Sequence, residues 1–274
     1  GVPLLEIVSE PDIFSAEEAE AYARKLRALL QYLGVNHGDM SKGVLRFEAN
    51  VSVMHKDDTE YRQRREIKNL NSIRSMFRAI NEEVAWQIRQ YETGGTVKAA
   101  TLGWDENANK IIVQRYKERP DEYRYFPDPD LPILVATPEQ VESVRAGMPE
   151  LPDAKKQRYM AEMGLSAYDA GLLVMEQKVG QYYETVLAEG IDAKSAANWV
   201  INNLFTLLNA SERPREAIFE THVPPRALAE LVKLVQNATI NSSTAAKVLE
   251  SMWQTGDSAA AIVEREGLAQ INDA

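Results

Sequence analysis

The hydrophobic pattern of this 274-residue chain changes its period near Pro138. Before that point, apolar and polar residues alternate in several short runs, which is typical of half-buried β-strands. After it, apolar residues recur every three or four positions, as on one face of a helix, and we find no convincing strand. We therefore expect an α+β domain followed by helical domains.

The first part of the chain is expected to hold an antiparallel sheet with two helices. Ser15 and Glu18 form a capping box at the start of the first helix, and Gly94-Gly95 ends the second. The predicted strands are 4–8, 44–54, 61–69, 96–102 and 110–116, and the predicted helices are 15–33 and 72–93.

Helical stripes fill the remainder of the chain, and proline residues divide it. Pro214 and Pro224-Pro225 mark a boundary, so we predict three domains: 1–137, 138–220 and 221–274. Asp257 is expected to cap the last helix. The predicted helices are 138–147, 153–163, 166–174, 177–189, 192–209, 225–237, 242–255 and 257–266.

Composition excludes several classes of protein and site. The formal net charge of −10 argues against a surface coated in Lys and Arg for indiscriminate binding of nucleic acid. There are no cysteines and the three histidines are far apart, so any metal should be a hard cation held by oxygen, such as Mg²⁺. No run approaches the ~20 apolar residues that cross a bilayer, so we expect no membrane-spanning helix.

Charged and amide side chains follow the predicted strands and are candidates for a site. Glu6 lies inside the apolar run 4–8, where a charge is costly to bury unless it is paired or binds a metal. On 44–54 and 61–69 the carboxylates and amides suit a hard cation, and the basic groups suit phosphate. Solvent-facing strands also alternate in this way, so a simple wet face explains the pattern as well. The residues concerned are Arg46, Glu48, Asn50, Arg62, Arg64, Glu66, Lys68 and Asn69.

Two further stretches have both a structural and a functional interpretation. Tyr123, Arg124 and Tyr125 open a proline-rich segment that either closes a domain edge or lines a cleft for a ribose, base or phosphate. The basic stretch of Lys155, Lys156 and Arg158 is either a solvated helix face or a contact with RNA phosphate.

Four ordered strings in the first half carry a resemblance to a known family, the B subunit of the aspartyl/glutamyl-tRNA amidotransferase. They are Val2-Pro-Leu-Leu-Glu-Ile-Val-Ser-Glu-Pro-Asp12, Leu45-Arg-Phe-Glu-Ala-Asn-Val-Ser52, Arg65-Glu-Ile-Lys-Asn-Leu-Asn-Ser72 and Glu122-Tyr-Arg-Tyr-Phe-Pro-Asp-Pro-Asp-Leu-Pro132. Shorter matches, such as Leu151-Pro-Asp-Ala154 and Asn198-Trp-Val200, extend the resemblance along the whole chain.

The resemblance implies a fold and a reaction. The fold would be a cradle-like α+β catalytic domain, a helical domain and a helical tail that contacts tRNA. The reaction would be a ligation that converts Glu-tRNA(Gln) or Asp-tRNA(Asn) to its amide, in the bacterial cytoplasm or, as the alternative, in an organelle. The B subunit would use ATP and Mg²⁺ to phosphorylate the side-chain carboxylate. The A subunit, an amidase, would release ammonia from glutamine to displace the phosphate, and a small C subunit would accompany both.

The resemblance also implies roles for residues of this chain. Glu6 and Glu48 would hold Mg²⁺, with Glu66 in the same cluster, and Lys68 would act beside them as a contact to phosphate or to the substrate carboxyl. Contacts to ATP or substrate would come from Arg46, Asn50, Asn69, Asn71, Tyr123, Arg124 and Tyr125, and contacts to tRNA from Lys155, Lys156 and Arg158. Many members of the family have Arg-Cys-Asp-Ala-Asn where this chain has Arg46-Phe-Glu-Ala-Asn50, which moves the carboxylate by one methylene.

The chain lacks the family's N-terminal region and the end of its tail, so we expect a fragment that is inactive alone. A non-catalytic module that binds tRNA through helices 150–274 is the alternative, although such a scaffold has no need of the strand motifs in 44–72. The sister protein of archaea carries a large extra domain after the cradle. Here about twenty residues separate Pro132 from the helical region, so we reject that assignment.

Overall fold

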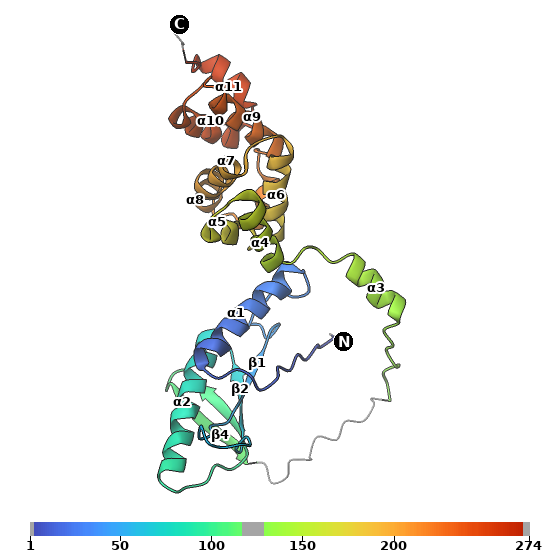
Figure 1. Cartoon of the computed structure of the whole chain (residues 1–274), viewed down its shortest axis with the longest axis vertical. Helices are drawn as coiled ribbons and strands as arrows, with labels where there is room; N and C mark the ends of the chain where they lie inside the picture. The colour runs from blue at the N-terminus through green and yellow to red at the C-terminus, as the bar shows by residue number, and fades with distance from the viewer. Residues whose placement is uncertain (1–2, 117–128, 271–274) are drawn as a thin grey trace. The chain divides into compact units, whose positions relative to one another are not determined.

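The computed structural model describes residues 3–116 and 129–270, and the chain divides into two compact units, Gly1–Gly147 and Met148–Ala274. The first unit contains a four-stranded sheet with helices, and the second consists of helices (Figure 1). This confirms the predicted α+β class with an all-α region after it. The predicted domain boundaries at 137/138 and 220/221 stay predictions.

The sheet of the first unit has the strand order β1-β2-β3-β4. Its strands are β1 (Phe47–Val51), β2 (Arg65–Leu70), β3 (Ala100–Asp105) and β4 (Lys110–Tyr116). β1 pairs antiparallel with β2, and β3 with β4, but β2 and β3 run parallel. The prediction of a purely antiparallel sheet is therefore wrong at this central pair. Helix α2 (Ile73–Glu92) joins these two strands, and such a crossover allows them to run in the same direction.

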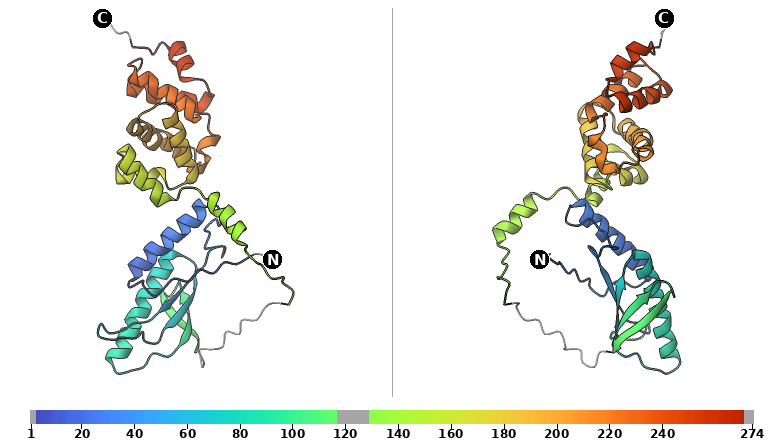
Figure 2. Two further views of the ribbon diagram at one scale, coloured as in Figure 1. Left: turned by 45° about the vertical axis from the view of Figure 1, so that its right-hand side comes forward. Right: turned by 180° about the vertical axis from the view of Figure 1, so that it is seen from behind.

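Helix α2 lies against the sheet, and α1 (Ala16–Tyr32) packs on α2 (Figures 1 and 2). Ile67 of β2 and Leu102 of β3 are fully buried in the core beneath these helices. Ser15 caps α1 as predicted, since it accepts a hydrogen bond from the backbone N–H of Glu18, but Glu18 accepts from the N–H of Phe14, so the predicted capping box is only half formed. Ser72, expected as the first residue of the second helix, is its cap and accepts a hydrogen bond from the N–H of Ser75. The opposite face of the sheet carries polar side chains.

The expected strand 4–8 is not formed, and residues 3–13 contain no helix or strand. Leu4 and Val8 are 86% and 80% exposed. A strand is stable only where a neighbouring strand satisfies its backbone groups, and none of the described residues pairs with this segment. The hydroxyl of Tyr61 donates a hydrogen bond to the carbonyl of Pro11 and so contacts the end of the segment.

The second unit is a stack of short helices around one hydrophobic core, which runs from Tyr159 to Val263 and so extends on both sides of residue 220. The predicted helices are present, with two refinements: a π-helical turn replaces the middle of 192–209, and Ser258 rather than Asp257 caps the last helix. Asp257 instead pairs with Arg265. The helices after the sheet are α3 (Pro138–Ala146, in the first unit), α4 (Pro152–Met163), α5 (Ala167–Leu173), α6 (Gln177–Ala188), α7 (Ala193–Asn198), η1 (the π-helix Trp199–Leu204), α8 (Phe205–Ala210), η2 (the 3-10 helix Arg215–Glu220), α9 (Pro225–Gln236), α10 (Ser242–Thr255) and α11 (Ala259–Glu266).

In the part of the chain that the structure describes, no helix has both the length and the apolar character needed to cross a membrane.

Candidate functional site

A row of polar side chains crosses the open face of the sheet, with one residue from each strand. Asn50 of β1 lies opposite Glu66 of β2, Glu66 opposite Thr101 of β3, and Thr101 opposite Arg115 of β4. Residues at matched positions of neighbouring strands project to the same face of a sheet. The row therefore presents an amide, a carboxylate, a hydroxyl and a guanidinium on one surface.

Beside this row, two carboxylates converge on one ammonium group. The Nζ atom of Lys68 lies 3.1 Å from a carboxylate oxygen of Glu48 and 3.2 Å from one of Glu66. Burial disfavours the charged form of Lys68. Its hydrogen bonds to Glu48 and Glu66 outweigh that effect, so the pKa of Lys68 lies above its usual value. We call Glu48, Glu66 and Lys68 the carboxylate–lysine cluster. Glu48 and Glu66, expected in one cluster, thus lie on either side of Lys68, and the roles expected of these residues stay predictions.

Thr101 and Arg115 extend the cluster, and sequence reasoning did not identify either of them. The hydroxyl of the buried Thr101 donates to Glu66 over 3.4 Å and accepts from Nε of Arg115 over 3.5 Å. Both residues belong to the predicted hairpin, but nothing in its alternating pattern indicates that β3 pairs with β2. The pairing is what brings these side chains to the site.

A buried network on the helix side holds β1 and β2 in place. Nη1 of Arg65 lies 3.2 Å from Glu83 of α2, and its guanidinium stacks 4.0 Å over the ring centre of Trp86. Gln87 donates to the carbonyl of Val51 and accepts from the N–H of Val53, each over 3.0 Å. Gln87 also donates to Glu83 over 2.7 Å. These bonds tie the end of β1 to α2 and so fix the strand that carries Glu48 and Asn50.

Glu83 is fully buried within this network, and that burial raises the pKa of its carboxyl. The hydrogen bond from Gln87 and the charge of Arg65 act in the opposite direction but do not cancel the effect. The ion pair of Arg65 and Glu83, which we call the buried pair, is therefore a structural element of the covered face. Its charges do not reach the open face.

Other predicted site residues lie apart from the cluster. Glu6 is in the exposed segment 3–13, and within residues 3–116 no hydrogen bond or ion pair joins it to the carboxylate–lysine cluster. Arg46 is exposed and donates from Nε to the carbonyl of Gly43 over 3.2 Å. Asn69 and Asn71 are exposed near the end of β2, and Asn69 adopts a positive φ of 59°, which asparagine tolerates better than most residues.

The expected common face of Arg62, Arg64, Glu66 and Lys68 is only half formed, because β2 begins at Arg65. Arg62 instead pairs with Asp58 over 2.5 Å and lies over the ring of Tyr91. Arg64 is exposed before the strand. The residues Tyr123, Arg124 and Tyr125 lie outside the described part of the chain.

The basic stretch of α4 is joined to acidic residues within the helical unit. Lys155 is buried and lies 3.3 Å from Glu184, and Arg158 lies 2.5 Å from both Glu150 and Glu184. Lys156 is half-buried on the same helix. Contact between these residues and tRNA stays a prediction, and two of the three already have partners inside the fold.

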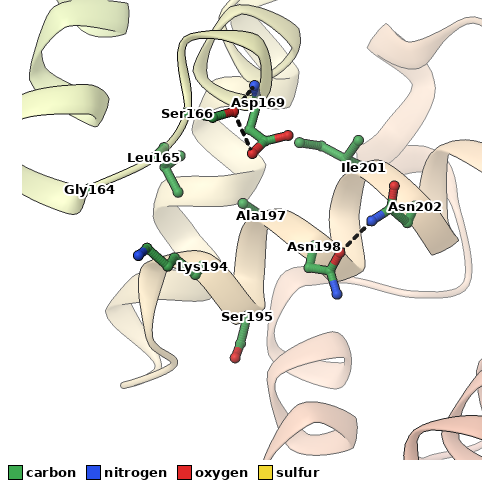
Figure 3. Close-up of a pocket in the computed structure, with 10 residues that line it drawn as sticks. All are labelled: Gly164, Leu165, Ser166, Asp169, Lys194, Ser195, Ala197, Asn198, Ile201 and Asn202. Atoms are coloured by element: carbon green, nitrogen blue, oxygen red, sulfur yellow. Dashed lines mark hydrogen bonds between the residues drawn. The ribbon is translucent and has the colours of Figure 1, made fainter.

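A hollow of about 510 Å³ with a mixed polar and apolar lining lies in the helical unit, between the α4–α5 turn and the segment 194–202 (Figure 3). Ser166 and Asp169 line one side, and Lys194, Asn198 and Asn202 line the other. The side chain of Asn202 donates a hydrogen bond to that of Asn198 within the π-helical region. Sequence reasoning gave no indication of this hollow.

No group of three or more acidic or histidine side chains that could hold a metal gathers within residues 3–116 and 129–270. The carboxylates of Glu48 and Glu66 are the two that meet on the open face, at Lys68. The site therefore offers a pair of hard oxygen ligands beside two cations, Lys68 and Arg115. Such an arrangement suits a phosphorylated or carboxylated ligand together with one divalent cation.

Both parts of the chain match known protein families. Residues 1–142 match the GatB/GatE catalytic domain, and residues 181–274 match the GatB domain. The chain belongs to the GatB/GatE family.

Curated relatives in several bacteria are named as the B subunit of the aspartyl/glutamyl-tRNA(Asn/Gln) amidotransferase. The one from Gluconobacter oxydans is 48% identical over 273 residues, covering 100% of this chain and 56% of the relative. The relatives from Thioalkalivibrio sulfidiphilus and Caldicellulosiruptor saccharolyticus are 47% and 42% identical, each over 100% of this chain and 57% of its own length. The chain thus spans a little over half the length of these relatives.

Proposed function

We propose that this chain supplies part of the catalytic domain in the B subunit of an aspartyl/glutamyl-tRNA amidotransferase. On its open sheet face, the side-chain carboxylate of the amino acid on a mischarged tRNA would be phosphorylated. The convergence of Glu48 and Glu66 on Lys68 carries the proposal, because it supplies carboxylates and a cation on rigid strands. The names of the bacterial relatives support the same reaction.

The chemistry explains why such a face is needed. Ammonia does not displace oxide from a carboxylate, because oxide is a poor leaving group. In the proposed reaction a carboxylate oxygen attacks the γ-phosphorus of ATP and ADP leaves. Ammonia then attacks the acyl carbon, so that a C–N bond forms, the C–O bond to phosphate breaks and inorganic phosphate departs. The protein must hold the reactants in line and neutralise charge on the transferring group.

The donor set of the open face fits Mg²⁺, which proteins commonly bind through one or two carboxylates together with substrate phosphates. Glu48 and Glu66 would hold the ion, since their oxygens already meet at one cation, the ammonium of Lys68. When bound, Mg²⁺ would neutralise charge on the phosphate oxygens. Lys68 would hold the carboxylates in position and add a second positive charge. Glu6 stays a proposed further ligand.

The proposed reaction needs partners. Glutamine hydrolysis by the amidase, the A subunit, would supply the ammonia, and a small C subunit would complete a heterotrimer. Glu-tRNA(Gln) or Asp-tRNA(Asn) would be the substrate in the bacterial cytoplasm. The helical unit has a hydrophobic core of its own. We propose that it serves as the tRNA-binding part.

The test uses the full-length subunit in its complex with the variant Glu66→Gln, which keeps the shape of the side chain and removes its charge. We expect transfer of the γ-phosphate of ATP to Glu-tRNA to fall by about 100-fold, or about 2.7 kcal/mol of transition-state stabilisation. Glutamine hydrolysis by the partner amidase is the internal control.

Glu92→Gln is the matched control variant, because Glu92 is an exposed glutamate at the end of α2. It should phosphorylate Glu-tRNA at the wild-type rate. Phosphorylation by Glu66→Gln at that same rate would falsify the assignment of the open face as the site.

A further inference from the structure

Arg115 is a cation of the open face whose charge is not matched within residues 3–116. It is exposed on β4, which forms one edge of the sheet, and its hydrogen-bond partner there is the neutral hydroxyl of Thr101. Lys68 differs, since it lies between Glu48 and Glu66. The positive charge of Lys68 is thus already compensated by carboxylates, whereas that of Arg115 is available to an anion.

Thr101 sets the direction of the Arg115 side chain. A hydroxyl has one proton to donate, and that of Thr101 goes to Glu66, so its oxygen is free to accept from Nε of Arg115. Because Thr101 is only 4% exposed, this oxygen is a fixed anchor. With Nε engaged, the terminal nitrogens of the guanidinium remain for a ligand, and they match two oxygens of a phosphate.

The spacing of the sheet makes Arg115 and the carboxylates complementary parts of one site. Glu66 lies on β2 and Arg115 on β4, two strands away in the same row. Adjacent strands are about 4.8 Å apart, so the two backbones are separated by roughly 10 Å. A polyphosphate can bridge such a span, with a cation held at the carboxylates and phosphate oxygens held at the guanidinium.

We propose that Arg115 binds a phosphate group of a polyphosphate ligand on the open face, with Thr101 as its positioning residue. The identity of that ligand as ATP rests on the proposed function, but the phosphate site itself does not. The competing explanation is that Arg115 only ties the edge strand β4 to β3 through Thr101, which requires no ligand.

The direct test is a titration of this chain with inorganic tripolyphosphate, followed by NMR of ¹⁵N-labelled arginine side chains. The Nε–Hε signal of Arg115 is assigned by its loss in Arg115→Gln. We expect this signal to move on titration and the dissociation constant to rise by about 10-fold in Arg115→Gln. Arg115→Lys keeps the charge but cannot make two parallel hydrogen bonds to a phosphate, so its dissociation constant should lie between those of the wild type and Arg115→Gln.

Lys110→Gln is the matched control, because Lys110 is an exposed cation at the other end of β4. It should bind tripolyphosphate as the wild type does. Thr101→Val should weaken binding by about 3-fold, and Thr101→Ser, which restores the hydroxyl, should recover it. An Arg115 signal that does not move, or equal binding by Arg115→Gln and the wild type, overturns the proposal.

Two further measurements separate this inference from its alternatives. Arg115 is exposed, so Arg115→Gln should melt within a few degrees of the wild type; a large loss of stability would support the purely structural explanation and overturn the proposal. In the full-length subunit, Arg115→Gln should raise the KM for ATP more than it lowers kcat. If tripolyphosphate binds through Arg115 but the full-length subunit transfers no phosphate to tRNA, the proposed function fails and the phosphate site stands.

Discussion

The two faces of strand β2 carry similar ionic groups, but those on one face are enclosed by the protein and those on the other are partly open to solvent. On the covered face, Arg65 and Glu83 are 3% and 0% exposed, and Arg65 stacks against Trp86. On the open face, Lys68 and Glu48 are 31% and 45% exposed. A buried charge that loses its partner cannot turn to water, whereas a half-exposed one can exchange its partner for solvent or a ligand. Glu66 of the open face is itself only 9% exposed, so the difference lies in its partners: Lys68 and Glu48 can be reached by water or a ligand, whereas both members of the buried pair are enclosed.

The largest effect should come from breaking the buried pair. Glu83→Ala leaves Arg65 as an uncompensated buried charge and removes the acceptor of Gln87, so we expect a loss of about 3–5 kcal/mol in the free energy of unfolding of the first unit. Chemical denaturation followed by the fluorescence of Trp86 and Trp104 measures it. Glu48→Ala on the open face is the control and should cost less than about 1 kcal/mol. Equal losses in the two variants would contradict the distinction between the faces.

A smaller effect should appear in the pH dependence of stability. The pKa of Glu83 is raised in the folded chain, so the folded state binds more protons than the unfolded state once the pH exceeds the unfolded value of about 4.3. The contribution of Glu83 to stability therefore falls as the pH rises from there through the folded pKa. Unfolding free energies measured between pH 4 and pH 7 should show this slope, and Glu83→Gln should flatten it. An unchanged slope in that variant would count against the raised pKa.

The smallest effect is expected at Lys68. Its raised pKa means that its stabilising contacts are fully present below the unfolded value of about 10.4 and are lost as the pH rises through the folded value. Lys68 is partly exposed, and Glu66, although only 9% exposed, keeps the hydrogen bond from Thr101, so Lys68→Met should cost less than about 1 kcal/mol at pH 7. Thermal melts at pH 7 and pH 11 should differ less in the variant than in the wild type. A loss as large as that of Glu83→Ala would show that the open face is also structural.

Local signals in the sequence were enough to predict the helices and the hairpin. Ser15 occupies its predicted cap position, and Gly94 ends the second helix with a positive φ of 73°, as the Gly94-Gly95 pair predicted. Capping depends on a few neighbouring residues, so the sequence contains the whole of the signal. The same holds for the closeness of Glu48, Glu66 and Lys68, which follows from two adjacent strands with charged faces.

Contacts between distant segments could not be predicted in this way. The alternating pattern of 100–105 does not say which strand lies beside it, so the parallel pairing with β2 and the row through Thr101 and Arg115 were missed. The burial of Arg65 could not be predicted either, because it depends on the contacts of Arg65 with Glu83 and Trp86 of α2. The prediction of a strand at 4–8 was wrong for the same reason, since an apolar run does not specify a neighbouring strand for it to pair with.

The π-helical turn Trp199–Leu204 has a consequence for how the chain tolerates changes in length. A turn of this kind holds one more residue than an α-helical turn, so removing one residue there would leave a regular helix running from α7 into α8. Because the wider turn takes up the extra residue, the residues after the deletion would keep their positions around the helix axis. Phe205 and Leu208, now 2% and 0% exposed, would therefore stay in the core. A one-residue deletion in a regular α-helical stretch would instead rotate every later residue by about 100°.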